Sequence, residues 1–570
     1  MKWLTFLITA VFIPLFANSE KPEFQISGYV WDFESGEALI GANVIIENSQ
    51  GAATDHEGYF QLFSKQDSLQ LQIKYLGYEE VNTSFYLTSD TILQISLKPV
   101  QTRLREVVVR NENGSLHNGR SNLQKIDLEN IDELPAFMGE QDIMKILQFK
   151  PGISSGSEAS SGLFVRGGQP GQNLFLVDGI EIYNPTHLFG FFSIFNPDAL
   201  RSVELYKGDF PARFGGRTSL AVDIQMKNGN QNKLTGSGGV GLISSRLTLE
   251  IPVVKNKSSL IISGRRTYAD IFTEEINQKN RDNPNFQQIP RYYFFDLNAK
   301  YHYRFNDRHQ VSVSSYFGSD DLNYEDQSDL QFLMTWGNRL LSVNSQHQIT
   351  DKLFWSNSIG YTGYAYKVKT LSNYYTINLQ SKINDWVLKS DLTYDFSDNH
   401  YLNAGIKITD HQFQLNQLET NSEGFGENIS EGQAMRAREY GLYLSDHLYL
   451  GSVAEIESGI RLSAFSNQKF FSGLEPRLNV VFLPEADFNI KAGYSEAYQY
   501  VHLLSNSGVS LPTDFWHPSN EFIEPQHSRQ IAGGVNYNLG ENYIISNEIY
   551  YRWMSNMIDF KDGGKIFVNK

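Results

Sequence analysis

Apolar and polar residues alternate with a two-residue period along much of the second half of the chain. From Phe295 to Phe305 every second residue is apolar or aromatic, and the residues between them are Asp, Asn, Lys, His and Arg. The same alternation recurs in residues 386–396 and 543–551. Because successive side chains of a β-strand point to opposite faces, each segment predicts a strand with one apolar and one polar face. Such strands build either a soluble β-sandwich or a β-barrel whose outer face contacts lipid.

The connections between these segments favour the barrel. Short polar turns alternate with long irregular stretches, as in membrane barrels that have short periplasmic turns and long outer loops. The short turns lie near Asn256, Asp307, Asp351, Asp398, Ser452, Glu485 and Glu541, and the long stretches are residues 273–291, 318–334, 414–435 and 499–527. No stretch reaches about 18 consecutive apolar residues, so a membrane-embedded chain of this kind crosses the bilayer as strands. We therefore predict an antiparallel transmembrane β-barrel over residues 229–570.

Composition and the N-terminus narrow the possible partners and locations. The 570-residue chain has a net charge of -16, which argues against nucleic acid as a partner because phosphate binding needs basic surface. The absence of cysteine excludes disulfides, thiolate catalysis, cysteine metal sites and a lipoprotein anchor. Lys2, the apolar run from Trp3 to Phe16 and the small residues Ala17 to Ser19 predict a signal peptide over residues 1–19.

Residues 23–99 carry five short strand patterns separated by turn signals. The patterns are residues 26–30, 42–47, 59–63, 69–75 and 92–97, and their spacing predicts a small β-sandwich. The phrases SGYV, LIGANVII, ATDHEGYFQL and IKYLGYEE resemble the carboxypeptidase regulatory-like domain, which implies a transthyretin-like fold and a periplasmic spacer or contact module without peptidase activity. Asp55 and Glu57 lack the further acidic positions of a calcium loop, so we expect them to form a turn.

Residues 163–216 are rich in glycine and contain several motifs in a fixed order. The apolar run Leu174–Val177 ends at Asp178-Gly179, and the alternating segment Ser202–Tyr206 ends at Lys207-Gly208. With Arg166-Gly167, Asn196-Pro197 and Ala212 to Gly215, these motifs resemble the plug domain of TonB-dependent outer-membrane receptors. The resemblance implies an α+β plug over residues 114–228, whose signature residues are Arg166, Gly167, Asp178, Gly179, Lys207 and Gly208.

Two glycine motifs near the plug evoke enzymes but do not fit them. A helix is expected from about Gly139 to Phe149, with Ile143, Ile146 and Leu147 on one face. The next residues, 152–156, match the G-x-S-x-G of hydrolases, which requires a strand before the serine and a helix after it. Residues 236–241, GSGGVG, continue into an alternating segment and indicate a glycine-rich first barrel strand. The sequence therefore predicts no enzyme, no cofactor and no metal site.

The seven short turns each join two strands and so predict fourteen strands. A barrel that encloses a plug has about 22 strands, because barrel diameter grows with strand number. We therefore expect residues 229–570 to form a partial barrel that lacks roughly the last third. The alternative is a smaller, complete barrel with its plug outside. Glu475-Pro476-Arg477 resembles the E-P-R of the receptor barrels and supports their relationship to this chain.

The linker over residues 100–113 contains the β-branched run LREVVVR. An exposed strand of this kind can add to the sheet of another protein through backbone hydrogen bonds. In receptors that this chain resembles, the TonB box lies here, and we assign Glu106, Val107, Val108 and Val109 to it. The alternative is that these residues form the last strand of the sandwich.

The resemblance implies active import across the outer membrane, with TonB as the energy-coupling partner and outer-membrane lipid around the barrel. Substrate would bind from outside to the plug and the extracellular loops, and the plug would rearrange. A siderophore-type small molecule is favoured as substrate. The alternatives are glycan or peptide import with a surface lipoprotein, and a receptor that senses ligand without transporting it. Loop residues such as Trp336, Phe515, Trp516, His502 and His517 could contact substrate, but the sequence assigns no binding site.

Overall fold

The computed structural model describes residues 24–46, 51–55, 57–64, 66, 68–87, 89–99, 123–126, 128, 140–156, 162–283, 285–325, 330–397, 399–422, 430–484, 486–505, 511–539 and 543–559. The predicted signal peptide and the predicted TonB box lie outside these residues. The chain divides into two compact units, one of residues 1–31 and 38–100 and the other of residues 32–37 and 101–570. Each unit is described by itself.

The first unit is the predicted β-sandwich. One sheet has the order β4-β1-β7, with β1 (Phe24–Asp32), β4 (Tyr59–Ser64) and β7 (Thr91–Leu97), and the other has the order β3-β2-β5-β6, with β2 (Asn43–Ile46), β3 (Gly51–Ala53), β5 (Ser68–Lys74) and β6 (Val81–Tyr86). Its core is apolar, and Ile26, Val44 and Ile73 are fully buried within it. The sequence missed β3 and β6, which are short or largely polar. Asp55 accepts hydrogen bonds from the Glu57 and Tyr59 amides at 2.8 and 2.9 Å, which gives it the expected turn role.

The plug is built on a five-stranded sheet with the order β12-β11-β16-β15-β8. Its strands are β8 (Leu123–Ile126), β11 (Asn173–Val177), β12 (Ile180–Glu181), β15 (Leu200–Lys207) and β16 (Leu220–Met226). β11 and β16 run parallel, and the other pairs are antiparallel. Short elements complete the domain: β9 (Ile153–Ser154), β10 (Phe164–Val165), β13 (Thr186–His187), β14 (Phe192–Ser193), η2 (Pro170–Gln172), η3 (Leu188–Gly190) and η4 (Pro197–Ala199).

The plug helix is shorter than the sequence predicts. α2 spans Ile143–Gln148, because the side chain of Asp142 accepts a hydrogen bond from the Lys145 amide and so fixes the N-terminal cap. The expected apolar face is present, since Ile143, Ile146 and Leu147 are buried. The predicted helix start at residue 139 is therefore wrong by four residues, whereas the predicted end at Phe149 is within one residue of the observed end.

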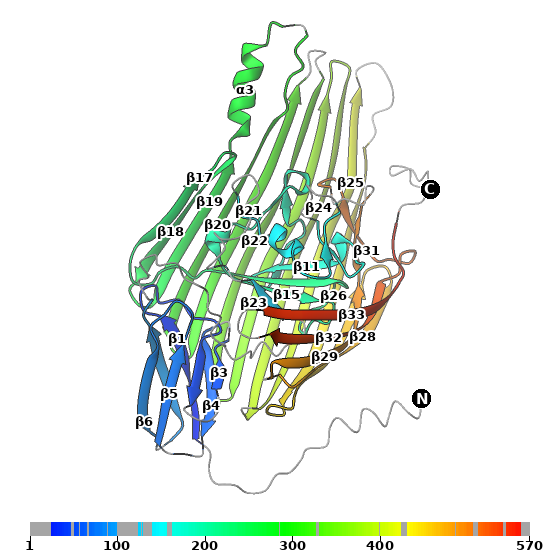
Figure 1. Ribbon diagram of the computed structural model, residues 1–570. Helices are drawn as coiled ribbons and strands as arrows, with labels where there is room; N and C mark the ends of the chain where they lie inside the picture. Colours follow the sequence, from blue (N-terminus) through cyan, green and yellow to red (C-terminus); the bar gives the residue numbers. More distant parts are fainter. Residues whose placement is uncertain are drawn as a thin grey trace. The chain divides into compact units, whose positions relative to one another are not determined.

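The C-terminal part of the chain forms one antiparallel sheet of 15 strands, hereafter the large sheet (Figure 1). Consecutive strands are neighbours, and within the described residues β17 and β33 each pair on one side only, so the sheet is open. Its strands are β17 (Thr235–Val240), β18 (Ser244–Val254), β19 (Ser258–Thr267), β20 (Arg291–Asn306), β21 (His309–Glu325), β22 (Gln331–Thr350), β23 (Leu353–Leu371), β24 (Tyr375–Ser397), β25 (His400–Ser422), β26 (Ser430–Tyr449), β27 (Ala454–Ser466), β28 (Phe470–Phe482), β29 (Phe488–Gln499), β32 (Gln526–Leu539) and β33 (Tyr543–Ser555).

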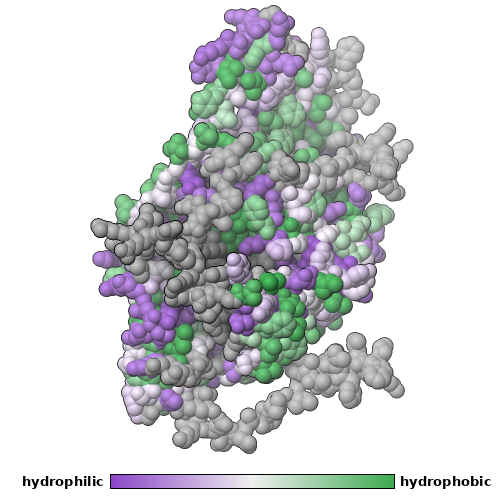
Figure 2. Space-filling model, in the orientation of Figure 1, coloured by the Kyte–Doolittle hydropathy of each residue, from purple (hydrophilic) through white to green (hydrophobic). Residues whose placement is uncertain are grey.

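The two faces of the large sheet have opposite chemistry. Along β20 the apolar set is turned outward, with Leu297 47% and Phe305 57% exposed, whereas Asp296 and Lys300 of the polar set are 2% and 4% exposed. In the view of Figure 2, apolar side chains gather over β29, β32 and β33. An apolar outer face and a polar inner face are typical of a membrane barrel, whereas the sheets of a soluble protein bury their apolar face and expose their polar face.

The fourteen strands counted from the turns are present as β18 to β29, β32 and β33. The glycine-rich strand β17 precedes them and brings the large sheet to 15 strands. Two predicted long stretches are wrong: β21 reaches Glu325 before β22 begins at Gln331, and β25 reaches Ser422 before β26 begins at Ser430. β24 and β25 have 23 residues each, although about 10 suffice to cross a bilayer. Beyond the lipid both faces meet water, so the alternation that reveals a strand fades there.

The remaining two long stretches also contain structure. Residues 268–290 include the helix α3 (Ala269–Lys279), and residues 500–525 include a hairpin of β30 (Val501–Leu504) and β31 (Phe515–Pro518). His502 and His517 are cross-strand neighbours in this hairpin. Figure 1 shows α3 rising beyond the end of the large sheet and the plug strands β11 and β15 lying against its middle.

Candidate functional site between the plug and the large sheet

The signature residues of the plug occupy turns with left-handed backbone. Arg166, Gly167, Asp178, Gly179 and Gly208 have φ values of 48°, 78°, 46°, 81° and 79°. A Cβ at Gly208 would also meet the side-chain amide of Gln530 on β32, which would have to shift. Their spacing in the sequence therefore marks chain reversals, and several of them also contact the large sheet.

Arg166 and Lys207 converge on one carboxylate of the large sheet. The Arg166 guanidinium lies 3.1 Å and the Lys207 ammonium 3.0 Å from the carboxylate of Glu548 on β33. Arg166 also donates to the Lys207 carbonyl oxygen at 2.8 Å, and Lys207 donates to the Pro151 carbonyl oxygen at 3.0 Å. Both cations are almost fully buried, so they need nearby carboxylates for charge compensation. Glu548 meets both of them, and Asp209 of the plug also lies 3.5 Å from Arg166.

Asp178 makes the equivalent contact with opposite polarity. Its carboxylate accepts a hydrogen bond from the Met226 amide at 3.0 Å within the plug. It also lies 3.2 Å from the ammonium of Lys300 on β20 and accepts a hydrogen bond from Ser314 on β21. Asp178 thus both reverses the chain after β11 and forms an ion pair with the large sheet.

The E-P-R motif of β28 holds a third plug segment. The Arg477 guanidinium donates to the carbonyl oxygens of Phe210, Pro211 and Phe214 at 3.0, 2.5 and 2.7 Å, and to the Glu475 carboxylate at 2.7 Å. The arginine of the motif therefore supplies hydrogen bonds to three carbonyl oxygens in and next to the turn at residues 211–216.

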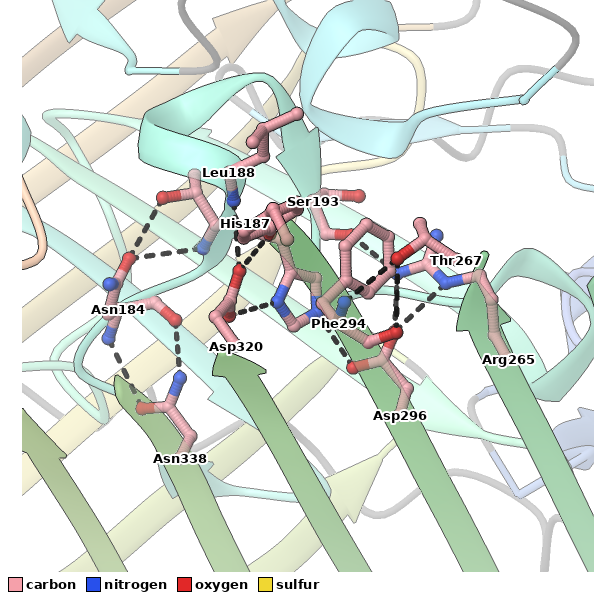
Figure 3. A network of polar contacts seen from close by, with 12 residues as sticks. Asn184, His187, Leu188, Ser193, Arg265, Thr267, Phe294, Asp296, Asp320 and Asn338 are labelled. Carbon is pink, nitrogen blue, oxygen red and sulfur yellow. Dashed lines mark hydrogen bonds and ion pairs between the residues drawn. The ribbon is translucent and has the colours of Figure 1, made fainter. Parts of the chain in front are cut away.

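His187 lies between two carboxylates of the large sheet (Figure 3). Its Nε2 is 2.8 Å from Asp296 and its Nδ1 is 2.6 Å from Asp320. Since a carboxylate accepts but does not donate, both ring nitrogens must carry protons, and the imidazole is cationic. Burial lowers the pKa of His187, but the charges and hydrogen bonds of Asp296 and Asp320 outweigh it and raise that pKa to about 9.

Further groups complete the network around His187. Arg265 on β19 pairs with Asp296 at 2.6 Å and donates to the Ser193 carbonyl oxygen of the plug at 2.7 Å. The Tyr316 hydroxyl donates to Asp296 at 2.6 Å. The ring of Phe294 stacks on the His187 ring, with centroids 4.1 Å apart. Two cations and two carboxylates therefore balance inside the interface. Figure 3 shows that these side chains come from neighbouring strands of the large sheet and from the antiparallel pair β13 and β14 with η3 between them, hereafter the plug hairpin.

An aromatic cluster continues this interface beyond the polar network. It includes residues named from the sequence, namely Trp336, Phe515 and Trp516, which lie on β22 and β31 rather than in irregular loops. Tyr183 packs edge-on to Trp516 with ring centroids 5.1 Å apart, and the Arg217 guanidinium lies 4.5 Å from the Trp516 centroid. A cavity of about 30 Å³ beside them is lined by residues that include Glu181, Tyr183, Leu503 and Trp516.

Sequence reasoning missed the partners on the large sheet. Asp296, Lys300 and Glu548 stand at polar positions of the predicted alternating segments, whereas Asp320 lies in residues 318–334, which the sequence predicted as irregular. The alternation of polar and apolar residues shows on which face of its strand a residue lies, but not which plug residue it contacts. Ser154, in the G-x-S-x-G match, lies in the two-residue strand β9 after α2, without the strand and helix order of a hydrolase elbow. Among the described residues, no three His, Asp or Glu side chains are grouped to hold a metal ion.

No helix in the described part of the chain is both long and apolar enough to cross a bilayer. Three family models match the chain: the CarboxypepD_reg-like domain at residues 26–109, the TonB-dependent Receptor Plug Domain at residues 118–222 and the TonB dependent receptor-like β-barrel at residues 267–569. A comparison with curated proteins gives no match.

Solved structures of outer-membrane proteins have a similar fold. The outer-membrane transporter YddB from Escherichia coli has a TM-score of 0.57 at 14% identity, with 76% of this chain and 69% of that chain covered. The siderophore receptor PirA from Acinetobacter baumannii has a TM-score of 0.56 at 16% identity, with 77% and 71% covered. A mutant of the ferric enterobactin receptor PfeA from Pseudomonas aeruginosa has a TM-score of 0.56 at 15% identity, with 80% and 73% covered.

Proposed function

The chain belongs to the TonB-dependent receptor family of outer-membrane β-barrel proteins, and on that premise we propose that it actively imports a siderophore-type small molecule, gated by rearrangement of its plug. TonB-dependent transport across the outer membrane is the general activity of the family. The substrate, the gate and the residues that contact TonB are the specific parts of the proposal.

The ionic character of the plug contacts carries the gating proposal. His187, Asp178 and Lys207 each meet an oppositely charged residue of the large sheet. A hydrogen bond to a charged group contributes only about 1.5–3 kcal/mol net, because the groups form bonds to water when they part. An interface of ion pairs can therefore be hydrated step by step as the plug moves, whereas an apolar interface would resist separation.

We assign energy coupling to Glu106, Val107, Val108 and Val109. The run can pair as an extra strand with a sheet edge of TonB, because main-chain hydrogen bonds supply the affinity in such complexes. Among the described residues the last strand of the sandwich is β7, which ends at Leu97, ahead of this run. The match to the sandwich family model extends to residue 109, so the competing assignment is a further strand of the sandwich.

The siderophore assignment has two supports. Buried and half-buried aromatic residues gather where the plug hairpin meets the large sheet, and they offer ring surfaces to a small ligand. Two of the similar solved structures are named as siderophore or ferric enterobactin receptors. Glycan or peptide import with a surface lipoprotein, and ligand sensing without transport, are the competing functions.

Deletion of residues 105–110 tests the proposal. We expect uptake driven by the proton gradient to be abolished while ligand still binds at the cell surface. Asn111→Ala and Glu112→Ala in the same linker are the matched controls and should leave uptake intact. Uptake that survives the deletion would show that LREVVVR is a structural strand and not the TonB box. It would favour passive diffusion or ligand sensing over active import.

A further inference from the structure

Two adjacent residues at the tip of the plug hairpin have a backbone that non-glycine residues rarely adopt. Leu188 and Phe189 have φ values of 46° and 54°, both in the left-handed region. Their β-carbons crowd the backbone there, so the conformation persists only if neighbouring contacts hold it. One such contact is the hydrogen bond from the Leu188 amide to Asp320, at 3.0 Å. The segment is thus held in a conformation that it would leave if a contact were lost.

The ring of Phe189 covers a buried tryptophan that has an unused donor. The ring centroids of Phe189 and Trp336 are 5.1 Å apart, and Trp336 is only 2% exposed. The indole Nε1 of Trp336 has no hydrogen-bond partner in the described residues, although a buried N–H without a partner is costly. Tyr292 stacks on the same indole at 6.1 Å and 26°. Phe189 itself is half-buried.

We propose that Phe189 is a removable cap over Trp336, and that the natural ligand displaces it with a planar aryl group that bears a hydrogen-bond acceptor. The ligand ring would take the place of the Phe189 ring, which packs on the indole at a tilt of 48°, and its acceptor would accept a hydrogen bond from the Trp336 N–H that the capped state leaves unpaired. Leaving the left-handed conformation would relieve the backbone of Leu188 and Phe189. This inference rests on the proposed import function and narrows its substrate to aryl-bearing molecules.

The cap is connected to the ionic contacts of the plug. Asp320 accepts hydrogen bonds from the Leu188 amide, the Tyr292 hydroxyl and His187. Movement of the Leu188-Phe189 segment therefore removes one of three donors from the carboxylate that pairs with His187. Ligand binding at the cap would weaken the contact between the plug hairpin and the large sheet.

Equilibrium binding by the purified full chain in detergent tests the cap. The probes are radioiron complexes of dihydroxybenzoate, which carries an aryl ring with acceptor oxygens, and of acetohydroxamate, which has no ring. We expect the aryl complex to bind and the hydroxamate complex not to. Because binding in detergent needs neither TonB nor a proton gradient, failure of energy coupling would leave this result unchanged.

The sign of the mutational effects distinguishes a cap from an ordinary contact residue. Phe189→Ala should tighten binding of the aryl complex by about threefold to tenfold, because an aromatic pair no longer competes with the ligand. Trp336→Leu should abolish binding, and Trp336→Phe, which keeps a ring but lacks the N–H, should weaken it by about fivefold. Leu188→Asn tolerates the left-handed backbone, stabilises the capped state and should also weaken binding.

Phe85→Ala, which removes a partly buried ring in the N-terminal β-sandwich and so lies outside the aromatic cluster, is the matched control and should change binding less than about twofold. Circular dichroism of each variant checks that the β-structure is kept. The proposal is overturned if Phe189→Ala weakens binding, if Trp336→Leu binds like the parent chain, if both complexes bind equally, or if neither complex binds.

Discussion

The interior of the plug and its contact surface with the large sheet are built from different chemistry. Inside, Val203, Leu205, Val222 and Ile224 are fully buried in an apolar core. At the contact surface the aromatic cluster is accompanied by buried ionic groups, namely His187, Lys207, Arg477 and their carboxylate or carbonyl partners. Apolar burial excludes water and resists separation, whereas ionic groups regain hydration when they part. The plug can therefore stay folded while its ionic contacts with the large sheet separate.

Leu205→Ala gives the largest expected effect and tests the apolar side of this comparison. Leu205 is fully buried, so its truncation leaves a cavity and should destabilise the plug by about 2–5 kcal/mol. Chemical denaturation followed by protease cleavage within the plug measures the loss. Leu462→Ala, at a site 50% exposed on the outer face of the large sheet, is the control and should change little. Equal effects at the two sites would contradict a distinct plug core.

The pH dependence of the His187 contacts tests the ionic side. The pKa of His187 is raised from 6.5 to about 9, so its stabilising contribution is complete below the unfolded pKa and is lost as pH rises through about 9. Arg265 stays charged in this range, and Asp296 and Asp320 would then face a neutral ring. We expect residues 184–193 to become more sensitive to protease between about pH 7 and about pH 10. The stabilising free energy lost from the hairpin over this range is on the order of 2 kcal/mol.

His187→Gln supplies the control for that titration, because glutamine keeps a donor but does not ionise. The variant should show weaker protection of the hairpin at neutral pH and no further change across the alkaline range. A parent chain whose protection is flat with pH would show that His187 does not hold the hairpin as an imidazolium.

Tyr316→Phe is the smallest expected effect and sharpens the comparison. It removes the hydroxyl that donates to Asp296 at 2.6 Å but keeps the ring. Because Arg265 and His187 still satisfy Asp296, the cost should be about 1 kcal/mol, measured as a small fall in the thermal midpoint of the plug. Tyr537→Phe on the outer face serves as the matched control. A loss as large as that of Leu205→Ala would show that the ionic surface is as rigid as the core.

Much of the fold followed from local pattern. Alternation around residues 295–305 fixed which side chains of β20 face inward, and the seven short turns fixed the strand order. The signature residues fell at left-handed turns, where Asp178 and Gly179 reverse the chain between β11 and β12. The strand ends beyond the bilayer and the start of α2 escaped prediction, because neither depends on burial of one face.

The contacts that hold the plug were decided by the tertiary structure alone. His187 meets Asp296 across 109 residues of sequence, and Lys207 meets Glu548 across 341. Alternation determines the face on which a polar residue stands, since it is a property of a single strand. Which polar residue it meets depends on how the strands are staggered and where the plug lies against them. The sequence by itself determined the sandwich, the plug and the strands of the large sheet, and the packing of distant segments decided the ionic boundary between plug and sheet.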